Sequence, residues 1–500
     1  RMAAHPDVEG TPEVAGPGFI NLRLSASALQ RVVADVRSAG AAYGRCDLGH
    51  GRRVQVEFVS ANPVGPMHVG HGRWAALGDS MARVLEHAGW RAEREFYVND
   101  AGVQMDVFGA SVAARYLELL GREVEFPEDG YRGAYIAEIA EEVRAQQGDA
   151  LADLPPGELA LRCRELGYEL VLANHLKRVL HGMGVDFDVW FSERTLHAGQ
   201  PEGGPSEIEQ AIARLTELGH IFEEEGAVWF RSTAFGDDKD RVLRKSDGEY
   251  TYFAADIAYH WDKLDVRGFD RVIDIWGADH HGYVPRMKAA VAALGHEGQL
   301  DVVIGQLVNL FRDGEAVRMS KRTGEMVTFE ELLDEVGADA ARYWFLRRST
   351  DQQVDFDIGV AKAQSADNPV YYVQYAHARI CSILRKAAGA DTADESADVS
   401  AVVPASPDLA LLTDDAELTL LRKLAEFGEV VEAAAEALAP HKLAAYAEDL
   451  AATFHRFYTV CQVVGDDDAL TGARLALADA TRVVLATALG LLGVGAPQRM

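Results

Sequence analysis

The chain has 500 residues and is 48% hydrophobic, so it can bury more than one core and is expected to form two or three domains. Its 49 basic and 78 acidic residues give a net charge of −29, which argues against a general nucleic-acid coat protein. Four scattered cysteines exclude a zinc ribbon and a disulfide scaffold and favour a reducing cytosol, and no apolar run approaches the roughly 20 residues that cross a bilayer.

The first elements are a tail and a helix. Residues Arg1 to Ala15 are rich in Pro, Gly and Glu and are expected to form a mobile tail. Residues Ser25 to Ala39 carry apolar side chains at helical spacing, with a serine to begin the helix and Gly40 to end it. The chain therefore predicts an amphipathic helix here.

The next stretch turns from a strand into a helix. Alternation over Val54 to Val59 predicts a strand, residues 60–66 have loop chemistry, and apolar residues after Gly72 recur at helical spacing. His68 and His71 therefore sit at a helix N-terminus, where free N–H groups and the positive dipole end suit a phosphate. A histidine pair is more usually a capping or core feature, so the pattern alone does not decide.

The middle of the chain alternates further strands with helices. Residues 101–184 are mostly helical, and Ile208 to Leu218 predicts another helix. Strands are expected at Glu95–Val98, Phe187–Phe191, Ala227–Phe230 and Val272–Trp276, the last of them apolar enough for a buried parallel strand. The strand–helix–strand order, with the ligand loop after the first strand, predicts an α/β doubly wound, Rossmann-like parallel sheet.

The last third of the chain is predicted to be all-α, a bundle that begins at about Gly359. An acidic loop is expected over residues 388–407. The expected helices are Asn368–Ala387, Asp414–Leu438, His441–Val464 and Leu470–Leu492.

Two short motifs and several longer ones carry a family resemblance. His68-Val69-Gly70-His71 and Arg318-Met319-Ser320-Lys321 resemble the two signatures of class I aminoacyl-tRNA synthetases. The longer matches resemble arginyl-tRNA synthetase, over about Gly16 to the last residue: Val56–Arg73, Tyr97–Gly102, Gly277–Tyr283 and Tyr372–Arg379.

The resemblance also implies a domain plan. Residues 1–50 would hold the tail and the remnant of an N-terminal domain that touches the tRNA elbow, most of which is expected to be absent. Residues 51–358 would form the catalytic nucleotide-binding domain, with insertions at about 105–190, and residues 359–500 the helical anticodon-binding domain.

The implied reaction is ATP-dependent activation of L-arginine, followed by transfer to tRNA(Arg) and release of AMP and pyrophosphate. Such a reaction needs positioning and stabilisation of oxyanions and no covalent nucleophile. The resemblance assigns catalysis to His68, His71 and Lys321, and ATP binding also to Gly70, Arg318, Met319 and Ser320. Arg318 stands where the family usually has its first lysine. Mg²⁺ is expected with ATP, although the sequence offers no dedicated metal cage.

Recognition of arginine requires carboxylates that face a planar guanidinium fork. By resemblance, Glu57, Asn62 and His68 contact the substrate near the first strand. Tyr252 and Asp256 lie at i and i+4 on one helical face, where the ring can cover the arginine stem and the carboxylate can take the guanidinium. Asp279 or His280 would line the rim, and the resemblance does not decide between them.

The C-terminal bundle is expected to read the anticodon through aromatic stacking and basic groups. Tyr371, Tyr375 and Arg379 share one helical stripe, and Tyr375 and Arg379 are the candidate tRNA contacts. His377 is adjacent, and His441, Phe457 and Tyr458 are further candidates. The alternative is that this aromatic stripe is bundle core. The family typically acts as a cytoplasmic monomer, without a membrane.

Two other functions compete with an arginine–tRNA ligase. A class I synthetase for another amino acid, such as cysteine, lacks support because its usual zinc-binding thiols are missing. A non-catalytic tRNA-binding relative would have no need of both phosphate motifs, and His68, His71 and Lys321 are all present. In the resembling family adenylate formation typically needs bound tRNA, which also separates it from most other synthetases.

Overall fold

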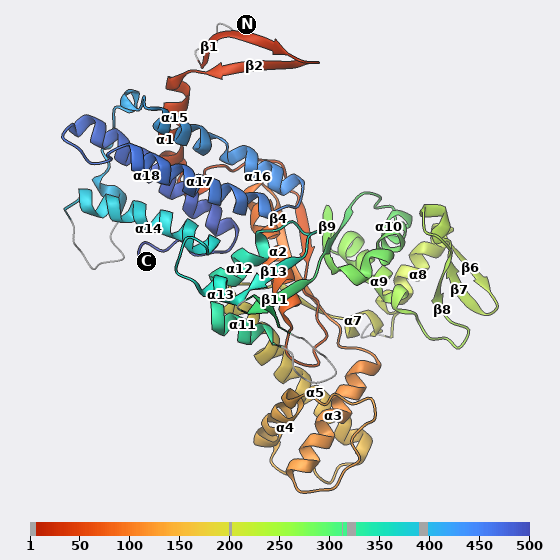
Figure 1. Ribbon diagram of the computed structural model, residues 1–500. Helices are drawn as coiled ribbons and strands as arrows, with labels where there is room; N and C mark the ends of the chain where they lie inside the picture. Colours follow the sequence, from red (N-terminus) through yellow and green to blue (C-terminus); the bar gives the residue numbers. More distant parts are fainter. Residues whose placement is uncertain (1–6, 200–202, 313, 318–326, 390–398) are drawn as a thin grey trace.

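The computed structural model describes residues 7–199, 203–312, 314–317, 327–389 and 399–500 (Figure 1). Its centre is a five-stranded sheet in the order β10-β9-β3-β4-β5, and every pair of neighbouring strands is parallel. The strands are β3 Arg53–Glu57, β4 Arg91–Val98, β5 Val189–Ser192, β9 Arg271–Gly277 and β10 Leu300–Gly305. The strand order reverses between β3 and β9, and ligands of such sheets bind outside the carboxyl ends of the strands at this point.

Helix α2, Val69–His87, follows β3 and is buried along almost its whole length. It lies close to the sheet because Gly78 has no side chain; a Cβ there would overlap the ring of Phe58. The predicted strand–turn–helix is therefore confirmed, although the strand ends at Glu57 instead of Val59.

Two insertions interrupt the sheet. The first, between β4 and β5, is helical as predicted and hangs below the sheet in Figure 1: α3 Val103–Leu119, α4 Ala134–Gln147, α5 Pro156–Leu170, a π-helical turn Val171–Lys177 and α6 Arg178–Gly182. The second, between β5 and β9, carries a small antiparallel sheet: α7 Arg194–His197, α8 Glu207–Glu217, β6 Ile221–Glu224, β7 Ala227–Phe230 and β8 Arg241–Arg244. It continues into α9 Tyr252–Trp261 and a π-helical turn Asp262–Val266.

A second small sheet, in the order β12-β11-β13, lies along the chain between the five-stranded sheet and the C-terminal helices. After β9 the chain forms α10, Val284–Ala293, and β10. The small sheet and the helices around it come next: β11 Val308–Arg312, β12 Glu315–Ala316, α11 Phe329–Val336, α12 Ala338–Leu346, β13 Val354–Asp357 and α13 Ile358–Lys362.

The C-terminal part is a helix bundle, as predicted, on which α1 Ala26–Ala39 also packs (Figure 1). Its helices are α14 Pro369–Ala387, α15 Asp415–Ala425, α16 Phe427–Glu436, α17 His441–Val460 and α18 Asp468–Leu491. The prediction of a single helix over Asp414–Leu438 is wrong. The helix is interrupted at Glu426, and the Phe427 ring that begins α16 is buried between Tyr43 and Tyr446. Helix α17 also ends earlier than predicted.

The prediction of a mobile tail is wrong for the described residues of the N-terminus. Strand β1, Val8–Ala15, pairs antiparallel with β2, Phe19–Leu24, through a turn in which Gly16 and Gly18 adopt φ of 58° and 97°. The hairpin extends away from the body of the molecule (Figure 1). Sequence periodicity missed it because strand β1 is largely exposed and contains Gly10 and Pro12. None of the described helices is long and apolar enough to span a membrane.

Candidate active site at the carboxyl ends of β3 and β9

The turn between β3 and α2 is tightly held. Val59 and Ser60 adopt φ of 71° and 43°, in the left-handed region that a β-branched valine rarely enters. The Ser60 hydroxyl donates to the Glu57 carboxylate over 2.8 Å and accepts the backbone N–H of Tyr97 over 3.2 Å. This strained turn directs the following loop to the N-terminus of α2.

His68 and His71 form the cap of α2, and their rings stack with centroids 3.7 Å apart. The His68 Nδ1 accepts the Gly70 backbone N–H over 3.1 Å, and the His71 Nδ1 accepts the His68 backbone N–H over 3.2 Å. Because both Nδ1 atoms accept, each neutral ring carries its proton on Nε2. Two ring N–H donors thus accompany the positive end of the α2 dipole, an arrangement suited to phosphate oxygens.

The glycines of this motif make room for aromatic rings. A Cβ on Gly70 would lie 2.9 Å from Cε1 of His68, and a Cβ on Gly72 would overlap the Phe329 ring. Gly70 therefore supports the cap in two ways: its N–H donates to His68, and its lack of a side chain leaves space for the His68 ring.

The second signature motif cannot be placed. Arg318, Met319, Ser320 and Lys321 lie outside the described residues. Thr328 and Phe329, which follow that segment, are described: Thr328 forms a β-bridge with His68, and the Phe329 N–H donates to the Met67 carbonyl over 2.9 Å. The chain that follows the undescribed segment thus pairs with the residues around the histidine motif.

A charge network forms the floor beneath this turn. Glu57 and Asp274 are neighbours across the β3–β9 ladder, and the fully buried Lys263 donates to both, over 2.6 and 3.0 Å. Asp274 also accepts from His260 Nε2 over 2.9 Å, while His260 Nδ1 contacts the backbone carbonyl of Asp256 over 2.8 Å. Burial raises the pKa of Glu57, whereas Lys263 and His260 overcome burial and hold the pKa of Asp274 at about 2.

Asp256 differs from these carboxylates in its hydrogen-bond partner, which is a tyrosine hydroxyl and not a lysine. Its Oδ2 accepts from the Tyr283 hydroxyl over 2.5 Å, and it forms no ion pair within the described part of the chain. Burial, opposed by the Tyr283 hydrogen bond, raises the pKa of Asp256 to about 6. Tyr252, one helical turn earlier on α9, is 79% exposed. This pair therefore leaves a carboxylate and an aromatic ring open to a cationic ligand.

The remaining predicted arginine contacts lie on the flanks. Asn62 is exposed and its side-chain amide donates to Gln104 of α3 over 2.7 Å. Asp279 and His280 occupy a 3₁₀ turn, Ala278–Tyr283, directly after β9, and their side chains face solvent as an ion pair of 3.7 Å. The structure thus brings both to the carboxyl end of β9 without separating their roles.

Four partners in this region were missed by sequence reasoning: His260, Lys263, Asp274 and Tyr283. Asp274 gave a usable signal, since a lone carboxylate within the apolar strand Val272–Trp276 requires a buried cation. Lys263 gave none, because its two partners lie 11 and 206 residues away in the chain, at separations that no helical or strand periodicity links.

The predicted stripe on α14 is partly exposed. Tyr371 and Tyr375 stack with centroids 6.1 Å apart, and Arg379 donates to the Tyr375 hydroxyl over 3.0 Å. The Arg379 guanidinium also lies 4.6 Å from the ring centre of Tyr458 on α17. An aromatic and basic surface of this kind suits unpaired bases.

Neither His377, the neighbour of the stripe in the sequence, nor the candidate Phe457 lies on this surface. His377 lies on the opposite side of α14, where it is buried and contacts the Pro497 carbonyl over 2.8 Å, and Phe457 is fully buried in the bundle core. His441 is the first residue of α17, and Tyr458 is a candidate whose ring contacts Arg379 of the stripe.

Comparison with known proteins identifies the family. A family model for the catalytic domain of class I tRNA synthetases (R) matches residues 33–380, and one for the DALR anticodon binding domain matches residues 373–500. An arginine–tRNA ligase of Carboxydothermus hydrogenoformans is 50% identical over 496 residues, which are 99% of this chain and 86% of that protein. This chain belongs to the arginyl-tRNA synthetase family.

Solved structures agree with membership of the arginyl-tRNA synthetase family. A chain from Campylobacter jejuni is 34% identical with a TM-score of 0.81, and the match covers 95% of this chain and all of that one. Thermus thermophilus arginyl-tRNA synthetase is 25% identical with a TM-score of 0.76, over 99% of this chain and 89% of that one. The predicted enzyme class and fold are confirmed, and use of ATP follows from the class I family.

Proposed function

We propose that this chain joins L-arginine to tRNA(Arg) through the residues gathered at the carboxyl ends of β3 and β9. In the first step an arginine carboxylate oxygen attacks the α-phosphorus of ATP, and pyrophosphate leaves. In the second step a terminal ribose hydroxyl of tRNA attacks the acyl carbon of arginyl-adenylate, and AMP leaves. Neither step forms a bond to the enzyme, so catalysis consists of positioning and charge stabilisation.

His68 and His71 are proposed to hold the α-phosphate. Support comes from the cap geometry, which directs both protons to Nε2 at the positive end of α2. Lys321 is proposed to stabilise the departing pyrophosphate, with Arg318, Met319 and Ser320 in the same loop. The pairing of Thr328 with His68 supports a common site.

Mg²⁺ is proposed to arrive with ATP. Among the described residues no group of three or more histidines, cysteines or carboxylates could hold a metal ion. Phosphate oxygens and water are proposed as its main ligands, which is common for Mg²⁺.

The observation that carries the assignment to arginine is the unneutralised carboxylate of Asp256. The floor carboxylates Glu57 and Asp274 share Lys263. Asp256 instead accepts from the Tyr283 hydroxyl and forms no ion pair with any described residue, and the exposed Tyr252 lies one turn away. A guanidinium can supply the missing charge with parallel N–H donors. Glu57, Asn62, His68 and either Asp279 or His280 are proposed to hold the rest of the substrate.

The exposed stripe on α14 is proposed to stack anticodon bases, with Tyr375 and Arg379 as its main contacts. Support comes from the stacked tyrosines and the guanidinium held against them. We further propose that the protein acts as a monomer in the cytoplasm.

The deciding experiment is arginine-dependent ATP–pyrophosphate exchange, with and without tRNA(Arg). Exchange that requires both arginine and tRNA is the expected result. L-Citrulline is the matched control, because it has the shape of arginine but a neutral urea group, and it should give no exchange. Equal exchange with citrulline would overturn the role of Asp256, and tRNA binding without any exchange would identify a non-catalytic relative.

A further inference from the structure

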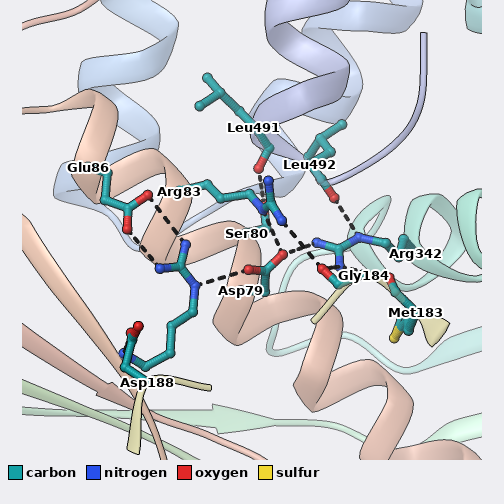
Figure 2. A network of polar contacts seen from close by, with 11 residues as sticks. Asp79, Ser80, Arg83, Glu86, Met183, Gly184, Asp188, Arg342, Leu491 and Leu492 are labelled. Carbon is teal, nitrogen blue, oxygen red and sulfur yellow. Dashed lines mark hydrogen bonds and ion pairs between the residues drawn. The ribbon is translucent and has the colours of Figure 1, made fainter. Parts of the chain in front are cut away.

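A buried carboxylate on α2 gathers three guanidinium groups (Figure 2). Asp79 accepts from Arg83 over 2.7 Å and from Arg94 over 3.1 Å, and it also pairs with Arg342 of α12. Asp79 is almost completely buried and Arg342 is completely buried. The three arginines overcome the effect of burial and keep the pKa of Asp79 below its ordinary value. Asp79 is therefore a charged anchor inside the protein.

Arg342 extends this anchor to two distant segments. Its Nε donates to the Leu492 carbonyl, just beyond α18, over 3.0 Å, and its Nη1 donates to the Met183 carbonyl, just beyond α6, over 3.2 Å. Gly493, at φ 67°, lies against the guanidinium, where any Cβ would overlap it. Figure 2 shows the fork of Arg342 between Asp79 on one side and these carbonyls on the other.

The end of α18 makes a second bond to α2. The Ser80 hydroxyl donates to the Leu491 carbonyl over 2.9 Å. Carbonyls at the end of a helix lack hydrogen-bond donors within that helix and form its negative pole. The Arg342 guanidinium and the Ser80 hydroxyl supply these donors, and the guanidinium also supplies a positive charge. The last turn of the anticodon-binding domain is thus fastened to the helix that carries the histidine motif.

We propose that Arg342 is a positioning residue that fixes the N-terminus of α2, and hence His68 and His71, to the end of α18. This role rests on the proposed function of the two histidines. Asp79 lies three turns along α2 from His68, about 16 Å away. Because α2 is one continuous helix, a shift of the helix at Asp79 also moves its N-terminus and the two histidines. A shift of about 1 Å at a reacting group can lower a rate by about a hundredfold, so loss of the fork should affect kcat before binding.

The test compares Arg342→Lys, Ser80→Ala and a matched control, Arg474→Met. Lysine keeps the charge facing Asp79 but cannot form the fork. Arg474 is also a largely buried arginine, paired with Glu417 over 2.7 Å and with the Gln462 carbonyl over 2.9 Å, but only within the C-terminal bundle. Pyrophosphate exchange at saturating tRNA gives kcat and KM, and hydrogen exchange of the amides at the start of α2 reports its position without relying on activity.

Arg342→Lys is expected to lower kcat by about tenfold or more with KM for arginine and ATP within about twofold, and to speed amide exchange at the start of α2. Ser80→Ala, which loses one hydrogen bond, should lower kcat by about threefold and serves if the lysine variant does not fold. Arg474→Met should change neither readout. The proposal would be overturned if the folded Arg342→Lys or Ser80→Ala variant kept the wild-type kcat and the wild-type rate of amide exchange in α2. It would also be overturned if Arg474→Met lowered kcat as much as these variants do. Absence of pyrophosphate exchange in the wild type would refute the proposed function. Hydrogen exchange of the α2 amides would still decide whether Arg342 positions this helix.

Discussion

Acidification should weaken arginine binding through Asp256. The substrate guanidinium stays protonated at every relevant pH, so the titrating partner is the protein carboxylate. The pKa of Asp256 is raised to about 6, chiefly by burial, and the groups that face it are Tyr283, His260, Glu193 and Glu57. A protonated Asp256 loses its charge and part of its acceptor capacity. Binding should therefore be strong above pH 6 and be lost as the pH falls through this value.

The magnitude follows from the fraction of Asp256 that is ionised. With a pKa of about 6, roughly a tenth of the free protein carries the charged form at pH 5 and nearly all of it at pH 8. The dissociation constant of arginine should then rise about tenfold between pH 8 and pH 5, because apparent affinity scales with the competent fraction. Stability has the opposite sign: because the pKa of Asp256 is raised by folding, the free protein should lose stability as the pH rises from about 4 to about 6, and bound arginine should offset this loss above pH 6.

Calorimetric titration of arginine between pH 5 and pH 8 provides the assay. Asp256→Asn should bind arginine weakly and with no step near pH 6. Glu57→Gln is the comparison, because Glu57 also has a raised pKa but is paired with Lys263. It should keep the step and move it to lower pH, since the charge of Glu57 contributes to the raised pKa of Asp256. A flat profile in the wild type, or the same step in Asp256→Asn, would refute the reasoning.

Three further predictions address the other parts of the molecule. His71→Ala removes an N–H donor from the phosphate side and should lower kcat of pyrophosphate exchange by about 10²–10³-fold while calorimetry shows unchanged arginine binding; an unaltered kcat would contradict this role. Lys263→Met leaves two buried carboxylates without their cation, so urea denaturation should show a loss of about 3–5 kcal/mol, whereas the exposed Lys245→Met should change stability little. Tyr375→Ala should weaken tRNA binding by about 1–3 kcal/mol in a filter-binding assay with normal arginine binding, and unchanged tRNA affinity would place the anticodon elsewhere.

The order of residues along the chain indicates most of the local elements and the identity of the catalytic turn. Apolar periodicity sets which faces of α1, α2 and the bundle helices are buried, and alternation sets the strands, because both depend only on backbone geometry. The histidine motif needs a strand before it and a helix after it. The alternating residues from Val54 and the helical spacing after Gly72 indicate both elements from neighbouring parts of the sequence. These features involve contacts close in the chain, so the order of residues contains them.

Only the tertiary structure decided which charges neutralise each other. Glu57 and Asp256 look alike as carboxylates in the sequence, but Lys263 reaches the first and leaves the second open to a ligand. The break at Glu426 and the fork of Arg342 likewise depend on residues that packing brings together. Electrostatic and packing energies act over a few ångströms in space whatever the separation in the chain, and for that reason periodicity cannot reveal them.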